Sequence, residues 1–406
     1  MGHVTPTDSG KFRANWREPD GKQRAKTFKT RKEANAYLAD VESAKNAGRY
    51  VNPHAGRTLF AMVAERWLAS RNDQPTTIAR DASIMANHVL AKWAGWPVGK
   101  IEHLDVQDWV TELGGRLAPA TVAECHRLMR AVLGAAVRHL LIGSNPADGV
   151  RLPARRVRDT DGVVISRELL RTRLLPAVPD RYRAVVAMAA GTGQRWGETI
   201  ADRLDVIDLD KRVVRVVRTI IEVGGHTSYK PFPKTKVGRR EIPLPSWLVP
   251  ILREHMAIYQ PNDDGLIFTN EAGGPLRRTL FRSRVWKPSL VRAGLLGEIL
   301  PDGDGFEGRW SDDQGVKHVE RFAKYDQAVR HVAKLAAGGM TFHDLRHSYA
   351  TWLVDDGVPV NMAQRVLGHE HASTTLQLYT RRTLDHERIL KALDDDDDDG
   401  LCQPVR

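Results

Sequence analysis

The chain has 406 residues, more than one hydrophobic core usually organises, so we expect two or three domains. Its formal net charge is +11 despite a run of aspartates from Asp394 to Asp399, and a surface this basic predicts a polyanionic partner. Two cysteines, Cys125 and Cys402, exclude a disulfide framework or a cysteine-based zinc site, and no apolar run approaches the roughly 20 residues of a membrane span. The N-terminus lacks the apolar stretch of a secretory signal, so we expect a soluble cytoplasmic protein with no membrane partner.

Residues 1–55 are predicted to begin with a small sheet. Apolar and polar side chains alternate from Phe12 to Trp16, as in a half-buried strand, and Asp20 and Gly21 predict a hairpin turn into a second strand. One face of the strand is cationic, which suits either a DNA groove or plain solvation. The candidate DNA-binding residues on this segment are Lys11, Arg13 and Arg17.

A helix is predicted to follow this sheet. Thr30 and Glu33 have the spacing of a capping box, in which each side chain bonds the backbone of the other residue. The apolar side of the helix holds Ala34, Tyr37, Leu38 and Val41. We therefore expect the helix to pack against one face of the sheet.

Residues 57–152 form a second, helical block after a linker that contains Pro53 and Gly56. In its last helix, Thr121 and Glu124 again have the spacing of a capping box. The apolar residues at helical spacing are Val122, Cys125, Met129, Val132, Leu133, Ala136 and Leu140. The interleaved arginines suit either phosphate contacts or a solvated helix face, and the candidate DNA-binding residues among them are Arg127 and Arg130.

Residues 160–393 form the third block, followed by an acidic tail at 394–406 that is expected to be disordered. The segment GTGQRWGE, residues 191–198, is not a dinucleotide fingerprint, because its third glycine is one position late and no suitable strand and acidic partner follow. It places Arg195 on a tight turn between glycines, where a ligand can approach the backbone closely. An ion pair between Arg195 and Glu198 is the alternative interpretation.

The segment TFHDLRHSYATWL places His343, Arg346 and His347 on one face of a predicted helix. Two histidines at this spacing resemble half a zinc site, which His369 and His371 could complete. A guanidinium among the ligands would repel the metal ion, so we expect no metal here. Arginine and histidine together suit a phosphate group better.

Tyr379 follows this segment in LGHEHASTTLQLY. A phenol has a pKa near 10, so it attacks at neutral pH only where cations stabilise the phenolate and a base takes its proton. Guanidinium groups also stabilise the extra charge of a phosphoryl transition state without metal. Lys234 and Lys236 lie between strand-like runs and could carry a proton to a leaving oxygen.

In combination and in this order, these elements resemble the tyrosine recombinases, the phage-type integrases that share a catalytic fold with type IB topoisomerases. The resemblance covers most of the chain. The segments that match the sequence boxes of this family are TGQRWGE, PKTKVGRREIPL, HDLRH and LGHEHASTTLQLY. The residues that the resemblance assigns to catalysis are Arg195, Lys234 (with Lys236 as the alternative), His343, Arg346, His369 and the nucleophile Tyr379, with Glu198 as the supporting acid.

The resemblance implies a multidomain α+β fold. Residues 1–55 would be an arm-site DNA-binding domain of sheet and helix, and residues 57–152 an all-helical core-site DNA-binding domain. Residues 160–393 would be a mainly helical catalytic domain with a small sheet. The stretch at 297–340 is longer than the family's minimal connection and is interpreted as an insertion, either a surface elaboration or a partner contact.

The resemblance also implies the reaction. Tyr379 attacks a DNA phosphate, forms a 3′-phosphotyrosyl link and frees a 5′-hydroxyl, with no cofactor. The two arginines clamp the phosphate, Lys234 protonates the leaving oxygen, His343 assists proton transfer and His369 hydrogen-bonds the phosphate.

The partners implied are double-stranded DNA attachment sites, of core and arm type, and a homotetramer on two duplexes. A directionality factor or a DNA-bending protein would join them, and the outcome would be integration and excision of a phage or mobile element. Two alternatives stay open: a type IB-like topoisomerase that uses the same residues, and a non-catalytic DNA-binding regulator.

Overall fold

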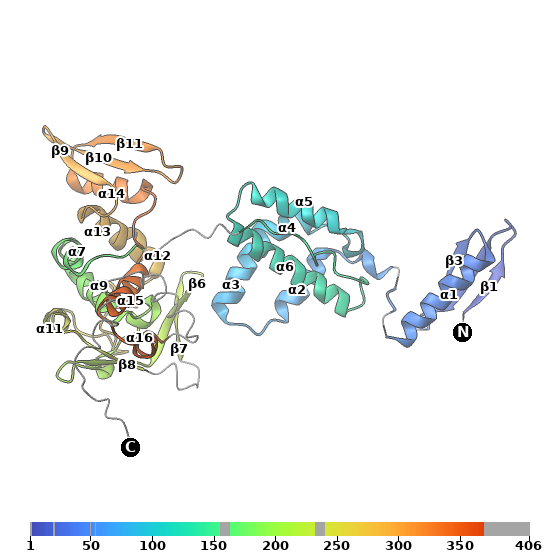
Figure 1. The fold of residues 1–406 in the computed structure, drawn as a ribbon, viewed down its shortest axis with the longest axis horizontal. Coiled ribbons are helices and arrows are strands. Elements are labelled where there is room, and N and C mark those ends of the chain that lie inside the picture. Colours follow the sequence, from blue (N-terminus) through green and yellow to red (C-terminus); the bar gives the residue numbers. More distant parts are fainter. Residues whose placement is uncertain are drawn as a thin grey trace, which may run out of the picture. The chain divides into compact units, whose positions relative to one another are not determined.

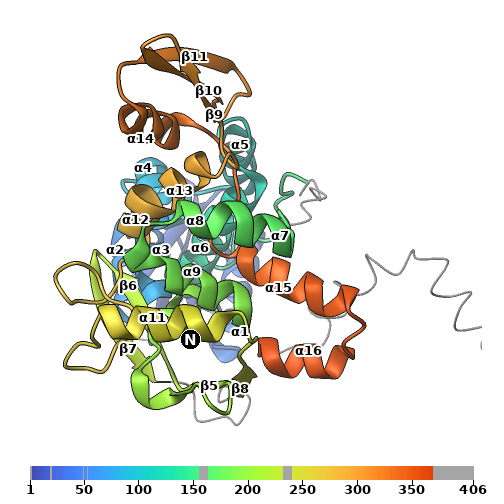
Figure 2. The same ribbon diagram turned by 90° about the vertical axis from the view of Figure 1, so that its left-hand side faces the viewer.

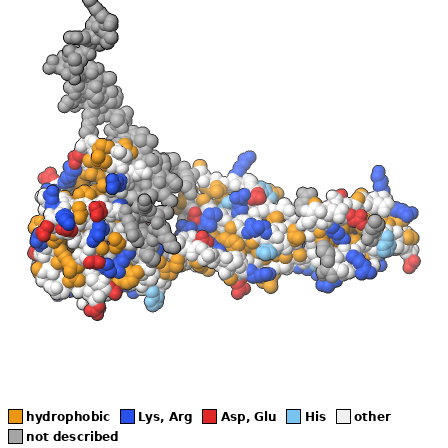
Figure 3. All heavy atoms as spheres, turned by 90° about the horizontal axis from the view of Figure 1, so that it is seen from below, with side chains coloured by type: hydrophobic (Ala, Val, Ile, Leu, Met, Phe, Trp, Pro, Cys, Tyr) orange, Lys and Arg blue, Asp and Glu red, His pale blue; other side chains and the backbone are white. Residues whose placement is uncertain are grey.

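The computed structural model describes residues 2–18, 21–48, 50–52, 54–154, 163–231 and 240–368. It divides into two compact units, residues 1–158 and residues 159–406. Among the described residues, no helix is both long and apolar enough to cross a membrane. Lys and Arg side chains are spread over the surface of the first unit in the view of Figure 3.

The first unit begins with an antiparallel sheet in the order β1-β2-β3, formed by β1 (His3–Pro6), β2 (Phe12–Arg17) and β3 (Gln23–Phe28). Helix α1 (Arg31–Asn46) covers one face of this sheet (Figure 1). The predicted capping box of Thr30 and Glu33 is confirmed, because each side chain bonds the backbone of the other residue. The residues buried between helix and sheet include Ala14, Trp16, Ala34, Leu38 and Val41. The predicted sheet backed by a helix is therefore confirmed.

A helical block follows, with its own core around the side chains of Trp93 and Trp109. Its helices are α2 (Phe60–Ala69), α3 (Pro75–Ile84), α4 (Leu90–Trp93), α5 (His103–Gly114) and α6 (Pro119–Arg138). Short helical turns occupy Ala55–Arg57, Met85–Val89 and Val98–Lys100.

The predicted start of α6 was wrong. The helix begins at Pro119 with Ala118 as its N-cap, so Thr121 lies inside the helix and forms no capping box. Proline is favoured in the first helical turn because its φ is already helical and its missing N–H has no intrahelical partner there. The helix also ends at Arg138, and Leu140 has a left-handed φ of 56° and is 41% exposed rather than part of the core.

Asp81 is fully buried in α3 and is surrounded by three arginines. Its carboxylate accepts hydrogen bonds from Arg71 and Arg80, and Arg127 Nη2 lies 2.8 Å from its Oδ1. Burial alone raises the pKa of Asp81, but the hydrogen bonds from these three arginines outweigh burial and hold the pKa below its usual value. The cluster ties α3 to α6.

The two arginines of α6 that were predicted to contact DNA both form ion pairs within this block. Arg127 Nε lies 2.9 Å from Glu124 Oε2, in addition to its bond to Asp81. Arg130 Nε pairs with Asp148 Oδ1, and both of these side chains are more than half exposed. Contact between these arginines and DNA stays a prediction.

Replacing Asp81 with asparagine is expected to lower the free energy of unfolding of the helical block by about 3 kcal/mol at pH 7, because three guanidinium groups lose their buried counter-charge. The loss applies above about pH 4, the pKa of Asp in unfolded chains, and shrinks as the pH falls through the lowered folded-state pKa. Hydrogen exchange of the full chain, read on peptides from α2 to α6, measures the difference. Equal exchange rates in the two proteins would contradict the assigned role.

The second unit is mainly helical and has one large core. Its helices before the insertion are α7 (Arg167–Leu169), α8 (Leu175–Ala177), α9 (Asp180–Thr192), α10 (Trp196–Thr199), α11 (Leu248–Ile258), α12 (Arg278–Phe281) and α13 (Lys287–Arg292). Helical turns at Leu170–Leu174, Leu204–Val206 and Arg282–Trp286 adjoin them. Helices α15 (Asp344–Asp355) and α16 (Val360–Leu367) end the described part. Helix α9 is buried along most of its length and packs against α11 and α15 (Figure 2).

Small antiparallel sheets complete this unit. Strands β4 (Ile207–Asp208), β5 (Val213–Val216) and β8 (Arg240–Pro243) pair in the order β4-β5-β8, and β6 (Arg218–Val223) pairs with β7 (His226–Pro231). In the sequence, Lys234 and Lys236 come between β7 and β8, at positions outside the described residues. The insertion contains β9 (Glu298–Asp302), β10 (Gly305–Ser311), β11 (Lys317–Phe322) and α14 (Tyr325–Leu335). The expected mixed, multidomain α+β fold is confirmed.

Candidate active site

Arg195 lies on the turn between α9 and α10. Gly193 caps the end of α9 with a left-handed φ of 64°, and a Cβ atom there would lie 2.4 Å from the ring of Tyr349. The turn therefore requires glycine. Arg195 then caps the start of α10, and its backbone N–H and Nη1 each lie 2.9 Å from a carboxylate oxygen of Glu198. Its side chain is 44% exposed, so the guanidinium also has an open side.

Glu198 forms a second ion pair, with Arg240 at the start of β8. Arg240 Nη2 lies 2.7 Å from Glu198 Oε2, and both side chains are almost fully buried. Burial alone raises the pKa of Glu198, but the hydrogen bond and charge of Arg240, followed by those of Arg195, outweigh burial and lower the pKa. Glu198 is therefore an ionised acid held between two guanidinium groups.

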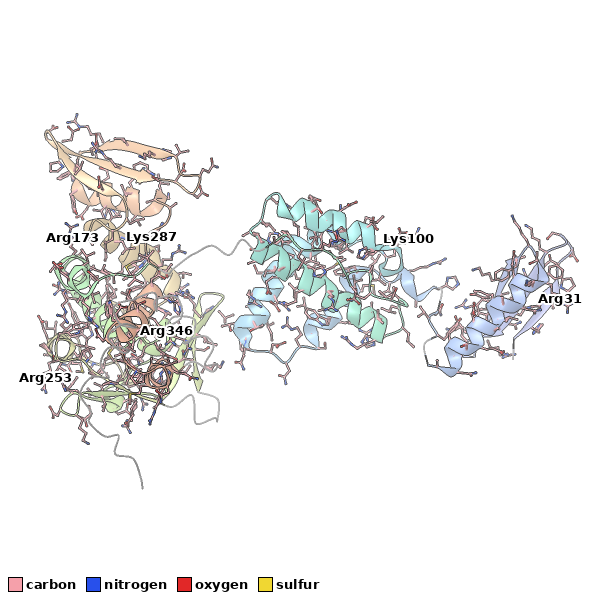
Figure 4. All side chains as sticks on the ribbon, viewed as in Figure 1. Arg31, Lys100, Arg173, Arg253, Lys287 and Arg346 are labelled. Atoms are coloured by element: carbon pink, nitrogen blue, oxygen red, sulfur yellow. The ribbon has the colours of Figure 1, made fainter. Side chains whose placement is uncertain are left out.

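Arg346 (labelled in Figure 4) is buried in the first turn of α15, next to the turn that carries Arg195. Its Nη1 donates to the carbonyl oxygen of Gly193 at 2.8 Å, and its Nη2 donates to that of Leu367 at 2.7 Å. Burial, and then the neighbouring charge of Arg195, lowers the pKa of Arg346 to about 9. The guanidinium therefore remains charged at neutral pH.

The C-terminal end of α16 is the point where three arginines meet. Arg240 Nε donates to the carbonyl oxygen of Val366 at 2.7 Å, Arg346 binds that of Leu367, and Arg195 Nη2 donates to that of Gly368 at 3.2 Å. The last carbonyls of a helix have no partner within it and carry partial negative charge, which cations satisfy. These three arginines therefore fix the position from which the chain continues into residue 369.

We call Arg195, Arg240, Arg346 and Glu198 the arginine cluster. It holds three guanidinium groups and one carboxylate. Burial is the largest cause of the lowered pKa of Arg346, and repulsion by the charges of Arg195 and Arg240 adds to it. A bound anion would relieve this repulsion, so the arrangement is already organised to stabilise negative charge.

His343 lies at the start of α15, next to the cluster. Its ring centre lies 4.9 Å from that of His347 in an edge-to-face arrangement. Partial burial of the ring, followed by the charges of His347 and Arg346, lowers the pKa of His343 to about 4. Its imidazole is therefore neutral near pH 7 and can accept a proton.

Tyr349 is the tyrosine of α15 and lies inside the unit, against Gly193. Burial raises the pKa of its phenol to about 12. This side chain packs beneath the arginine turn and is not suited to act as a nucleophile.

The structure brings together four of the predicted site residues, namely Arg195, Glu198, His343 and Arg346. The other predicted catalytic positions lie outside the described residues, and these are Lys234, its alternative Lys236, His369 and Tyr379. Within the described ranges, no three His, Cys, Asp or Glu side chains are grouped so as to hold a metal ion. Both His369 and His371, which the zinc hypothesis needed, lie outside those ranges.

Arg240 was missed by the sequence analysis, which treated GRREIPL only as the strand after the lysines. The strand alternates buried and exposed residues, with Arg240 and Ile242 buried and Glu241 exposed. An arginine in phase with a buried isoleucine on a strand predicts an inward-facing guanidinium that needs an acidic partner. This signal could have identified Arg240.

Comparisons with known proteins agree with this fold and site. Residues 1–47 match the family model described as the N-terminal domain of phage integrase, and residues 317–386 match the phage integrase family. A protein named as the phiRv2 prophage integrase of Mycobacterium tuberculosis is 28% identical over 406 residues, covering 97% of this chain and 94% of the relative. A XerC-like tyrosine recombinase of Caldanaerobacter subterraneus is 25% identical over 397 residues, covering 90% of each.

Solved structures with the same fold include integrases bound to DNA. The Tn1549 transposon integrase with circular intermediate DNA has a TM-score of 0.61 at 16% identity, covering 82% of this chain and 99% of that chain. A lambda integrase dimer bound to a COC′ core site has a TM-score of 0.53 at 16% identity, covering 94% of this chain and 95% of that chain. With the arginine boxes in order and two family models matched, the chain is a tyrosine recombinase of the phage integrase family.

Proposed function

We propose that this site-specific recombinase cleaves and rejoins DNA through a 3′-phosphotyrosyl link on Tyr379, in the integration and excision of a phage or mobile element. The observation that carries the proposal is the arginine cluster at the end of α16. Arg195 and Arg346 converge on the carbonyls of Gly368 and Leu367, just before the chain continues toward Tyr379. If a scissile phosphate bound there, the two guanidinium groups would replace their hydrogen bonds to these carbonyls with charge-assisted hydrogen bonds to the phosphate.

In the proposed reaction, the phenolic oxygen of Tyr379 bonds to phosphorus as the bond from phosphorus to the 5′-oxygen breaks. The phenolic proton leaves with the help of His343, whose pKa of about 4 keeps its imidazole neutral at pH 7, so that one ring nitrogen has a free lone pair for that proton. Lys234 gives a proton to the departing 5′-oxygen, and His369 hydrogen-bonds the phosphate. The ester energy is kept in the covalent link, so the reversal onto a partner strand needs neither ATP nor metal.

Strand exchange between two duplexes needs four protomers, so we include a homotetramer on DNA in this proposal. One of the structural neighbours is a lambda integrase tetramer bound to a Holliday junction, with a TM-score of 0.51. A directionality factor or a DNA-bending protein is the further expected partner. The proposed place of action is the host's DNA in the cytoplasm.

The proposal is tested with DNA that flanks the protein's own gene, carried on nicked suicide substrates and incubated with purified protein in EDTA. A covalent protein–DNA adduct on a denaturing gel, with the modified peptide identified by mass spectrometry, is the expected result. An adduct that requires added magnesium, or one on a residue other than tyrosine, would refute the proposed chemistry.

The N-terminal sheet is proposed to bind arm-type DNA with the face opposite to α1. Replacing Arg13 and Arg17 together by glutamine is expected to reduce the slope of log affinity against log salt concentration by about 2, because each phosphate contact releases about one counterion. Arg31→Gln, at the start of α1 (labelled in Figure 4), is the matched control and should leave the slope unchanged. Fluorescence anisotropy with arm DNA measures both. An unchanged slope in the double variant would refute this role.

A further inference from the structure

The insertion at residues 298–335 has the same architecture as the N-terminal sheet and helix. In both segments, three antiparallel strands are followed by one helix, and the middle strand of the sheet is the second in sequence. Strand β3 (Gln23–Phe28) and strand β11 (Lys317–Phe322) correspond residue for residue at a separation of 294 positions, and helices α1 and α14 begin at Arg31 and Tyr325, with the same separation.

The strand registers also agree. Phe12 pairs with Phe28 in the first sheet, and Phe306 pairs with Phe322 in the second. The first strand of each sheet has a proline opposite these phenylalanines, because Pro6 pairs with Phe12 and Pro301 pairs with Phe306. Residues 12–42 and 306–336 align without a gap. The identical pairs are Phe12 and Phe306, Trp16 and Trp310, Gly21 and Gly315, Phe28 and Phe322, Ala34 and Ala328, and Ala39 and Ala333.

The side-chain contacts inside the two cores repeat as well. Trp16 and Tyr37 have ring centres 5.3 Å apart with an angle of 65° between the rings, and Trp310 and His331 have 5.2 Å and 65°. The second ring contact repeats too: Phe28 lies 5.1 Å from Tyr37, and Phe322 lies 5.0 Å from His331.

A contact between an acidic and a basic side chain at the hairpin is also repeated. Glu18 pairs with Arg24 at 3.1 Å in the first copy, and Asp312 pairs with His318 at 2.8 Å in the second. Equal architecture, register, core contacts and hairpin pairing make residues 298–336 a second copy of the N-terminal unit.

The helix of the second copy differs on the side away from its sheet. Asn35 is exposed on α1, whereas Val329 at the matching position of α14 is fully buried. Helix α14 lies between its sheet and α13 (Figures 1 and 4), and Lys287 Nζ of α13 donates to the carbonyl oxygen of Ala336 at 2.9 Å. The second copy is therefore fixed to the catalytic core through its helix, and the opposite face of its sheet stays exposed.

The exposed faces of the two sheets differ in charge. In the first copy, the positions opposite to the helix hold no acidic residue, and they are His3, Thr5, Arg13, Asn15, Arg17, Gln23, Ala25 and Thr27. In the second copy they are Glu298, Leu300, Asp302, Gly305, Glu307, Arg309, Ser311, Lys317, Val319 and Arg321. Arg309 pairs with Glu307 at 2.6 Å, and Arg321 pairs with Asp302 at 3.0 Å.

These differences favour protein over DNA as the ligand of the second copy. Binding to the phosphate backbone depends on cations that are not already neutralised, and both arginines of this face are paired with acids. Two apolar side chains lie among these charges, with Leu300 38% exposed and Val319 62% exposed. A face with apolar side chains and both signs of charge suits a protein interface.

We infer that this face of the β9–β11 sheet is a docking surface for a second copy of the same chain. On β10, the acidic Glu307 is followed on the same face by the basic Arg309, so two such faces in antiparallel arrangement oppose unlike charges. A two-fold contact needs this kind of self-complementary surface. The inference rests on the proposed assembly of several protomers on DNA and gives that assembly a contact outside the active site.

The test compares Leu300→Asp/Val319→Asp with a matched variant of the first copy, Thr5→Asp/Ala25→Asp, which changes the corresponding positions. Both are made in full-length protein with Tyr379→Phe, so assembly is measured without cleavage. Sedimentation velocity on core-site DNA is expected to show association of DNA-bound protomers weakened at least about tenfold by the change in the second copy only. Circular dichroism establishes that both variants are folded.

DNA affinity separates the remaining outcomes. The second-copy variant is expected to bind core and arm DNA as tightly as the parent protein, and its Tyr379 form should cleave a single suicide substrate at the parent rate. Loss of DNA affinity with association unchanged would make the second copy a DNA-binding sheet and overturn the inference. Unchanged association and unchanged affinity would also overturn it, whereas failure of cleavage in all proteins would refute the proposed function alone.

Discussion

Tyr379→Phe is expected to abolish the covalent adduct with suicide DNA and to leave DNA binding within about twofold of wild type. The ring remains, but the oxygen that would bond to phosphorus is gone. Gel shift with core-site DNA measures binding, and a denaturing gel measures the adduct. Because the reaction is proposed to be metal-independent, both are measured in EDTA.

Tyr349→Phe is the matched control for this prediction. Tyr349 lies inside the site, yet burial raises the pKa of its phenol to about 12 and its ring packs on Gly193. Phenylalanine preserves that packing, so adduct formation should persist. If Tyr379→Phe still formed the adduct, the nucleophile assignment would be wrong. If only Tyr349→Phe lost it while remaining folded, Tyr349 would replace Tyr379 as the candidate.

Local sequence patterns predicted much of the fold, because they report the period of burial directly. Alternation from Phe12 to Trp16 gave β2, and the pairing of Thr30 with Glu33 gave the start of α1. The same capping pattern failed at Thr121, where Pro119 already starts the helix. A capping motif therefore locates a helix start only when no stronger signal lies just before it.

Four of the candidate site residues named from the sequence lie together in the structure, whereas Arg240, which supports them, was missed. Arg195, His343 and Arg346 were named as candidates from their order along the chain. The ion pair between Arg195 and Glu198, which was the alternative interpretation of Arg195, is also present. This pair is compatible with the role proposed for Arg195. The contacts of Arg240 with Glu198 and Val366 join segments more than 40 and more than 120 positions apart. Pairing between such distant segments leaves no pattern in the local sequence. The only local signal is that Arg240 alternates in phase with the buried Ile242 on its strand.

The repeated unit escaped the sequence analysis for a related reason. The two copies share their core positions, such as Trp16 and Trp310, but their solvent-facing residues differ in charge and the helix of the second copy has an apolar outer side. Six identities over 31 aligned positions are too few to notice without the strand registers. What persists is the packing that the fold needs, and what changes is each surface that meets a different neighbour.

Arg240→Met is expected to lower the rate of single-turnover cleavage at saturating DNA by about 100-fold, because displacement of catalytic groups by about 1 Å has costs of this size. Methionine fills the space but leaves Glu198 buried with one guanidinium partner and frees the carbonyl of Val366. Arg240 then no longer holds Glu198, which positions Arg195, or the carbonyl of Val366, which lies three residues before His369. Arg240→Lys keeps the charge and should lose less, although one ammonium group cannot serve both Glu198 and Val366.

A double variant separates positioning from stability. Breaking a buried ion pair by removing one partner typically costs about 3 to 5 kcal/mol, whereas removing both charges is far less costly. Glu198→Gln/Arg240→Met is therefore expected to regain most of the thermal stability lost in Arg240→Met, while cleavage stays slow because Arg195 and Val366 remain unsupported. Differential scanning calorimetry and quenched single-turnover assays give the two values. Recovery of the wild-type cleavage rate in the double variant would show that Arg240 serves only to neutralise Glu198 and does not position the catalytic arginines.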